Sequence, residues 1–209
     1  MSKAYQVVGI GNAVSDVIAT SSDEFLIENG VEKGIMQLVD QPRAEALFSA
    51  MGSRTETPGG SVANTIAGLG SLGLRTAFIG RVADDDLGHS YALAMQTEGT
   101  DFPNPPVRNA ELPTSRSMIF VSPDGERSMN TYLGISTELG PEDVPDEVAS
   151  KSELMFLEGY LFDKDKGKEA FRQASRLTRA AGGKSGIAIS DPFCVDRHRA
   201  DFLDMIGNE

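Results

Sequence analysis

The sequence is poor in the residues that build disulfides and soft metal sites: one cysteine and two histidines among 209 residues. Because Cys194 is alone, no intrachain disulfide can form and a four-cysteine zinc site is excluded. His89 and His198 leave little material for a histidine-rich metal centre. No run approaches the ~20 apolar residues of a membrane-spanning helix, and the first residues lack the pattern of a secretory signal. We therefore expect a cytoplasmic protein.

Basic residues are also scarce. Lysine and arginine total 19 against 31 aspartates and glutamates, a net charge of -12. This balance disfavours nucleic acid or an anionic membrane as a partner. Hydrophobic residues make up 40% and charged residues 24%, which excludes wholesale disorder. The length suits one large domain, or a core domain with a small satellite.

Short apolar runs alternate with helix-like segments along the chain. Strands are predicted at 5–11, 14–20, 35–39, 77–80, 154–157 and 186–190. Helices are predicted at 23–30, 40–48, from about 61 to 69, at 84–98 and at 164–181. Residues 115–133 are instead typical of a hairpin around a Pro-Asp-Gly turn, and 140–147 form a polar linker. The alternation predicts an α/β fold with a mostly parallel sheet and a small attached β element.

Three glycine-rich segments match nucleotide-binding patterns in composition but not in position. Residues 68–73 have the G-x-G-x-x-G spacing, yet they fall at the end of a helix instead of after a strand. Residues 9–14 carry Val14 where the third glycine belongs, and Gly-Lys-Ser at 183–185 follows a helix instead of preceding one. None of the three is expected to bind a nucleotide.

Two further clusters have a plain structural explanation. The acidic residues 84–86 could hold a metal ion, but capping of the following helix is favoured. Cys194 and His198 have a helical spacing, but no orienting acid is evident nearby, so a catalytic pair is not expected.

Polar residues after the first strand and a glycine pair before a later helix form one candidate site. Asn12 and Asp16 lie just past a strand's carboxyl end, where open α/β sheets place ligands, and together they could bind a vicinal diol. Gly59 and Gly60 would let a polar ligand approach the backbone, and Asn64 could reach the same ligand. The alternative is that Asn12 and Asp16 only fix a turn and that the glycines serve only conformation.

Taken together and in order, these segments resemble the ribokinase-like (PfkB) family of carbohydrate and nucleoside kinases over essentially the whole chain. The resemblance is carried by Asn12 with Asp16, by 59–64, by 80–88, by the hairpin at 124–129 and by 157–161. Within the family, the motifs look most like those of adenosine kinases and their bacterial sugar-kinase relatives.

The resemblance implies a three-layer α/β/α core with a small β-lid from about 14–20, 35–39 and 115–133. It also implies Mg²⁺-dependent transfer of the γ-phosphoryl group of ATP to a primary hydroxyl of a sugar or nucleoside, adenosine above all. A free-sugar kinase of the same family and a non-catalytic nucleoside- or sugar-binding module remain alternatives. A nicotinamide-dependent dehydrogenase, suggested by residues 9–11, is a distant one.

The resemblance assigns acceptor binding to Asn12, Asp16, Gly59, Gly60, Asn64, Arg127, Met129 and Leu133. Asn12 and Asp16 would hold the ribose diol. Met129 and Leu133 match positions of a purine pocket, with ordinary hairpin core as the alternative, and Arg127 could lie near the reacting hydroxyl and phosphate.

One motif of the family does not occur among these residues. The late Asp-Thr-x-Gly-Ala-Gly-Asp segment, whose final aspartate is the family's base, is missing from 1–209. The resemblance therefore implies that this is the N-terminal, acceptor-binding portion, that base and ATP site lie past Glu209, and that this portion alone cannot catalyse the reaction. Glu158 and Glu209 are candidates for organising Mg²⁺, with structural hydrogen bonding as the alternative for Glu158. The lid edge could pair two copies into a homodimer.

Overall fold

The computed structural model describes residues 3–208, and its core is a parallel five-stranded sheet, here called the main sheet. The strand order is β10-β9-β1-β5-β6. The strands are β1 (Tyr5–Ile10), β5 (Thr76–Ile79), β6 (Thr100–Asp101), β9 (Ser152–Glu158) and β10 (Lys184–Ala188). Every pair in this order is parallel, which confirms the predicted mostly parallel sheet.

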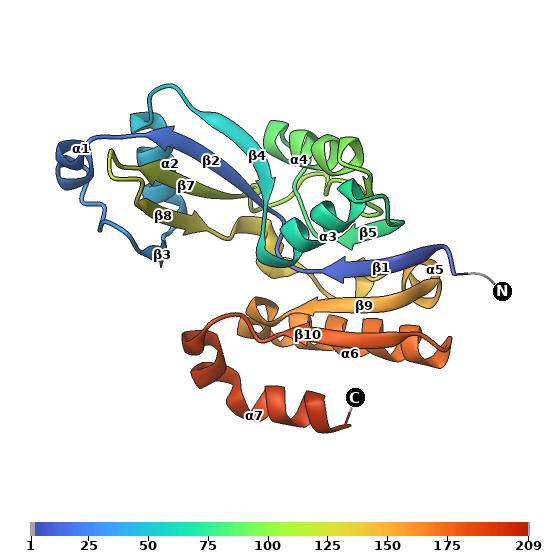
Figure 1. Ribbon diagram of the computed structural model, residues 1–209. Coiled ribbons are helices and arrows are strands. Elements are labelled where there is room, and N and C mark those ends of the chain that lie inside the picture. Colours follow the sequence, from blue (N-terminus) through green and yellow to red (C-terminus); the bar gives the residue numbers. More distant parts are fainter. Residues whose placement is uncertain (1–2, 209) are drawn as a thin grey trace.

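Helices cover both faces of the main sheet (Figure 1). One face carries α3 (Ser61–Ser71) and α4 (Asp86–Thr97), and the other carries α5 (Asp146–Ser150), α6 (Asp165–Ala180) and α7 (Pro192–Asn208). The short 3-10 helices are η1 (Gly134–Glu138), η2 (Pro141–Asp143) and η3 (Gly159–Asp163). Because side chains alternate along a strand, Val7 packs with α3 while Val8 and Ile10 pack with α6. The result is the expected α/β/α arrangement of three layers.

A second sheet, here called the lid sheet, projects from the core (Figure 1). Its order is β3-β8-β7-β2-β4. The strands are β2 (Val14–Thr20), β3 (Met36–Leu38), β4 (Thr55–Gly59), β7 (Ser115–Val121) and β8 (Arg127–Tyr132). One face packs on α1 (Asp23–Glu28) and α2 (Gln41–Ala50) through a separate apolar cluster.

The lid sheet is larger than the sequence predicts, because β4 was not foreseen. Its segment Thr-Glu-Thr-Pro-Gly has no large apolar residue and contains a proline, so it carries no strand signal. It forms an edge strand all the same, antiparallel to β2 with Asp16 opposite Thr57.

Several local predictions are confirmed and some boundaries are wrong. Asp85 caps α4 by accepting from the backbone N–H of Gly88 at 2.8 Å, so the acidic residues 84–86 mark a helix start. The hairpin turns at Gly125 with φ +86°. By contrast, β10 ends at Ala188 and not at Ser190, whose φ of +70° breaks the strand, and the linker 140–147 holds η2 and the start of α5. Within residues 3–208, no helix combines the length and apolar character that crossing a membrane requires.

Candidate functional site

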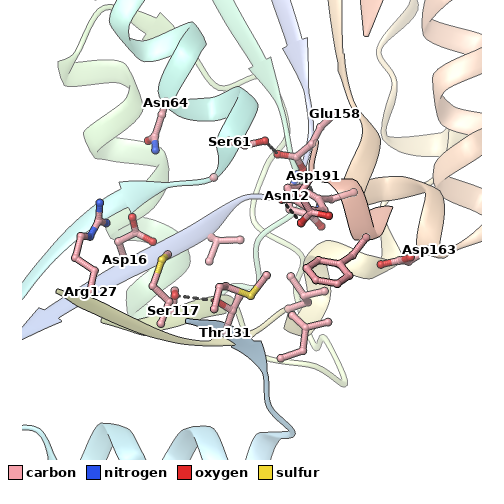
Figure 2. A pocket seen from close by; sticks show the side chains of 18 of the residues that line it. Asn12, Asp16, Ser61, Asn64, Ser117, Arg127, Thr131, Glu158, Asp163 and Asp191 are labelled. Atoms are coloured by element: carbon pink, nitrogen blue, oxygen red, sulfur yellow. Dashed lines mark hydrogen bonds between the residues drawn. The ribbon is translucent and has the colours of Figure 1, made fainter. Parts of the chain in front are cut away.

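A cavity of about 650 Å³ lies where the carboxyl ends of β1 and β9 meet the inner face of the lid sheet (Figure 2). Of the predicted acceptor-binding residues, those that line it are Asn12, Asp16, Gly60, Asn64, Arg127, Met129 and Leu133. Gly59 lies directly behind Asp16. The residues singled out from two distant segments therefore share one cavity of the size that small-molecule sites have. What they bind stays a prediction.

Asp16 is a carboxyl without a hydrogen-bond donor among residues 3–208. It is half-buried on β2 and points into the cavity beside Arg127 (Figure 2). Burial raises the pKa of Asp16 from 3.8 to about 6, and the positive charge of Arg127 opposes that rise. A carboxylate held in a cavity without donors is suited to accept hydrogen bonds from ligand hydroxyls.

The glycine pair makes room for the protein's own polar groups. A Cβ atom at Gly59 would lie 2.5 Å from the carboxyl carbon of Asp16, and one at Gly60 would lie 2.4 Å from the backbone oxygen of Asn12. Gly60 also has φ +109°, a conformation that favours glycine. Tyr91 holds this segment in place by donating to the Gly59 carbonyl at 2.9 Å. Contact of a ligand with the glycine backbone stays a prediction.

Glu158, at the end of β9, is buried between the two polar segments. Its Oε2 accepts from the backbone N and from Nδ2 of Asn12, at 2.6 and 2.8 Å. Its Oε1 accepts from the hydroxyl of Ser61 at 2.5 Å and from the backbone N of Val62 at 3.2 Å. The carboxylate is therefore saturated by protein donors, which favours the structural role weighed for Glu158 over a role in binding magnesium.

Magnesium commonly takes only one or two carboxylates from a protein, together with water and phosphate oxygens. Residues 3–208 hold no group of three or more histidine, cysteine, aspartate or glutamate side chains placed to bind a metal ion. Glu209, the other candidate, lies outside the described residues. The expectation that Mg²⁺ takes part therefore rests on the family resemblance.

An apolar wall faces the polar segments across the cavity. Met36 pairs with Met129 between β3 and β8, and Leu38 and Leu133 extend the same wall. Neither Met129 nor Leu133 belongs to the buried cluster of the lid sheet, so ordinary hairpin core does not account for them. Arg127, at the start of β8, lies beside Asp16 (Figure 2), and its predicted proximity to a phosphate stays a prediction.

The mouth of the cavity includes residues that the sequence did not single out. Tyr160 donates to Asp191 Oδ2 at 2.8 Å, and burial raises the pKa of the tyrosine well above its ordinary value. The other carboxylate oxygen of Asp191 accepts from the backbone N of Cys194 at 2.8 Å and caps α7, which lowers the pKa of Asp191. Phe193, 75% exposed, completes this side. The sequence marks this side of the cavity only through the Asp-Pro pair at 191–192, which is typical of a helix start.

Cys194 and His198 have different partners. The thiol of Cys194 is buried and points at the carbonyl of Gly159, 3.5 Å away, whereas His198 Nε2 lies 2.7 Å from Asp163. Burial raises the pKa of the Cys194 thiol, the opposite of what an activated nucleophile needs. The geometry therefore gives no support to a catalytic pair.

A family model for the pfkB family of carbohydrate kinases matches residues 35–207. The chain belongs to this family. The 5-dehydro-2-deoxygluconokinase of Halalkalibacterium halodurans is 31% identical over 123 residues, 58% of this chain and 37% of that protein. The guanosine-inosine kinase of Escherichia coli K12 is 25% identical over 163 residues, 74% of this chain and 37% of that one.

Solved structures confirm the fold over nearly the whole chain. The adenosine kinase from Sinorhizobium meliloti superposes with a TM-score of 0.87 at 49% identity, covering 97% of this chain and 62% of its own. A probable sugar kinase from Rhizobium etli CFN 42 gives 0.88 at 44% identity, covering 97% and 61%. The ribokinase-like fold is thereby confirmed. The chain spans under two thirds of the length of each of these relatives.

Proposed function

We propose that the protein of which these residues form the acceptor site transfers the γ-phosphoryl group of ATP to a primary hydroxyl of a nucleoside, with adenosine as the acceptor. One observation carries the proposal: the unpartnered carboxyl of Asp16 and the apolar wall of Met36, Leu38, Met129 and Leu133 border the same cavity. A ribose diol and a purine base present this combination of hydroxyl donors and flat apolar surface. A free sugar offers only the first.

In this mechanism the residues of the chain bind, orient and shield the acceptor. Asp16 accepts hydrogen bonds from the ribose hydroxyls, while Asn12 and Asn64 supply further polar contacts from the neighbouring segments. The apolar wall holds the base and excludes water from the reacting end. The group that takes the proton from the acceptor hydroxyl is expected outside residues 1–209.

Free-sugar phosphorylation is the second candidate function. It is favoured by similarity to the 5-dehydro-2-deoxygluconokinase of Halalkalibacterium halodurans at 31% identity and to the probable sugar kinase from Rhizobium etli CFN 42 at 44% identity. Both candidates use Asp16 in the same way, so the apolar wall separates them.

Calorimetric titration of the folded chain with adenosine and, separately, with ribose tests the proposal. We expect adenosine to bind at least ten times more tightly, because only the nucleoside buries apolar surface against the methionines and leucines. Asp16→Ala should abolish the heat of binding, and Asp196→Ala, at an exposed aspartate on α7, should leave it unchanged. Tighter binding of ribose would favour the sugar kinase, and no binding of either would reject both.

Pairing of two copies through the lid remains part of the proposal. β3 and β4 are the two edges of the lid sheet, and an edge strand offers backbone groups with which a strand of a second copy can pair.

A further inference from the structure

Glu158 is the one buried carboxylate among the residues that line the cavity. It is 1% exposed, and each of its two oxygens accepts from two protein donors. Since an ionised carboxylate has about four acceptor sites, none is left for a ligand. Its influence on the site must pass through the groups that it holds.

Those groups belong to the two segments that carry the candidate site. Asn12 follows β1, whereas Ser61 and Val62 open α3. The N-cap of α3 is Gly60, which has no side chain to satisfy the first N–H groups of the helix. Glu158 takes over this task from a distant strand by accepting from Val62 at the second helical position. One carboxylate therefore ties the start of α3 to Asn12 (Figure 2).

The same bond fixes which end of the Asn12 amide is the donor. Because a carboxylate only accepts, the atom 2.8 Å from Glu158 must be the NH₂ nitrogen of Asn12. The amide oxygen then faces the hydroxyl of Ser136 at 2.9 Å. The single proton of that hydroxyl faces two acceptors, the Asn12 oxygen and the carbonyl of Leu133 at 2.7 Å, and the Leu133 carbonyl also accepts from the hydroxyl of Ser115. The second hydrogen of Nδ2 has no partner within residues 3–208.

We propose that Glu158 is a positioning residue that sets the polarity of the acceptor site. It holds Asn12 so that an N–H is offered to the ligand, and it locks Asn12 to the start of α3, where Asn64 lies one turn further on. The ligand atom at Asn12 is then an acceptor, while the ligand groups at Asp16 are donors. This inference rests on the proposed function for its ligand, but the hydrogen-bond arrangement itself does not depend on it.

A double-mutant cycle on adenosine binding tests the proposal. In Glu158→Gln an NH₂ group replaces one acceptor and faces donors, so Asn12 loses its fixed orientation. We expect Glu158→Gln and Asn12→Ala each to raise the dissociation constant for adenosine at least tenfold. The dissociation constant of the double variant should lie within twofold of that of the more weakly binding single variant. The proposal would be overturned if the two substitutions raised the dissociation constant independently, so that their fold-changes multiplied in the double variant. It would also be overturned by a folded Glu158→Gln variant whose dissociation constant is within twofold of that of wild type.

Two further measurements keep the test decisive if Glu158→Gln folds poorly. Ser136→Ala removes the hydroxyl that contacts the Asn12 oxygen and the Leu133 carbonyl but leaves Glu158 intact, and it should weaken binding threefold or more, whereas unchanged binding would count against the proposal. Glu147→Gln, at a glutamate 85% exposed on α5, is the matched control and should bind like wild type.

The proposal can also be tested without any ligand. In nitrogen-15 spectra, the Asn12 side-chain amide should exchange its hydrogens at least ten times faster in Glu158→Gln than in wild type. Equal exchange rates would overturn the positioning role even if adenosine binds. Conversely, a wild-type protein that binds neither adenosine nor ribose would reject the proposed function while this exchange test still applies.

Discussion

Asp16 should lower the free energy of unfolding of the unliganded protein as the pH rises, and replacing its carboxyl group should abolish this loss. Burial raises the pKa of Asp16 to about 6 from 3.8, so the folded state favours the protonated carboxyl. The stability associated with this group is therefore fully present below pH 3.8 and is lost as the pH rises through about 6. Asp16→Asn keeps the shape of the side chain but never acquires the charge.

The magnitude follows from the shift. A difference of about two pKa units corresponds to about 3 kcal/mol, since each unit is worth about 1.4 kcal/mol. Asp16 is only half-buried, so about 3 kcal/mol is an upper value. We expect Asp16→Asn to match wild type in free energy of unfolding near pH 4 and to exceed it by up to about 3 kcal/mol at pH 8.

Urea denaturation of both proteins at several pH values between 4 and 8 measures this difference. Asp196→Asn, at an exposed aspartate, is the control and should show no such trend. A difference between wild type and Asp16→Asn that does not grow with pH would refute the reasoning. So would a variant that is less stable than wild type at pH 8. On the proposed function, adenosine should bind the wild type and not the variant, because the carboxylate that lowers stability is the one proposed to accept the ligand hydroxyls.

Two other substitutions test the packing of the site. Gly60→Ala places a methyl group 2.4 Å from the Asn12 backbone oxygen at φ +109°, and we expect it to lower the free energy of unfolding by at least about 2 kcal/mol in urea denaturation. Gly68→Ala, inside the helix that Gly60 precedes and with nothing within 4 Å of the added methyl group, should instead raise the free energy of unfolding by about 0.5–1 kcal/mol, and equal effects of the two substitutions would contradict this account. Met129→Ala should weaken adenosine binding at least fivefold in calorimetry while ribose binding stays the same. A loss shared by both ligands would show that the wall does not hold the base.

Much of the candidate site follows from the sequence because its parts obey local rules. Asn12 comes directly after the buried strand β1 and Asp16 lies at the start of β2, while Gly60 and Asn64 lie at the start of a helix that begins at the same sheet edge. The carboxyl ends of parallel strands meet at one edge, so such residues converge even when they are far apart in the chain.

The parts that could not be predicted depend on contacts without a local pattern. Glu158 is 146 residues away from Asn12, and no spacing or composition marks it as the partner of that amide. β4 pairs with the edge of β2 although its Pro-Gly end favours a turn and it has no large apolar residue. Tyr160 and Asp191 reach the mouth through η3 and the start of α7, whose positions depend on packing against Phe162 and Phe202.

The polar end of the cavity coincides with the place where the two sheets are joined. Only residues 11–13 separate β1 from β2, and Gly60 alone separates β4 from α3. Asn12 lies in the first of these connections, and Glu158 ties it to the helix that follows the second. A rotation of the lid sheet about these connections would hardly move Asp16 and Asn12, whereas Met36 and Leu38 on the far edge strand β3 would travel further. On the proposed function, the residues assigned to the diol are therefore fixed by these short connections, whereas the side chains of β3 assigned to the base lie on the strand of the lid sheet furthest from β4.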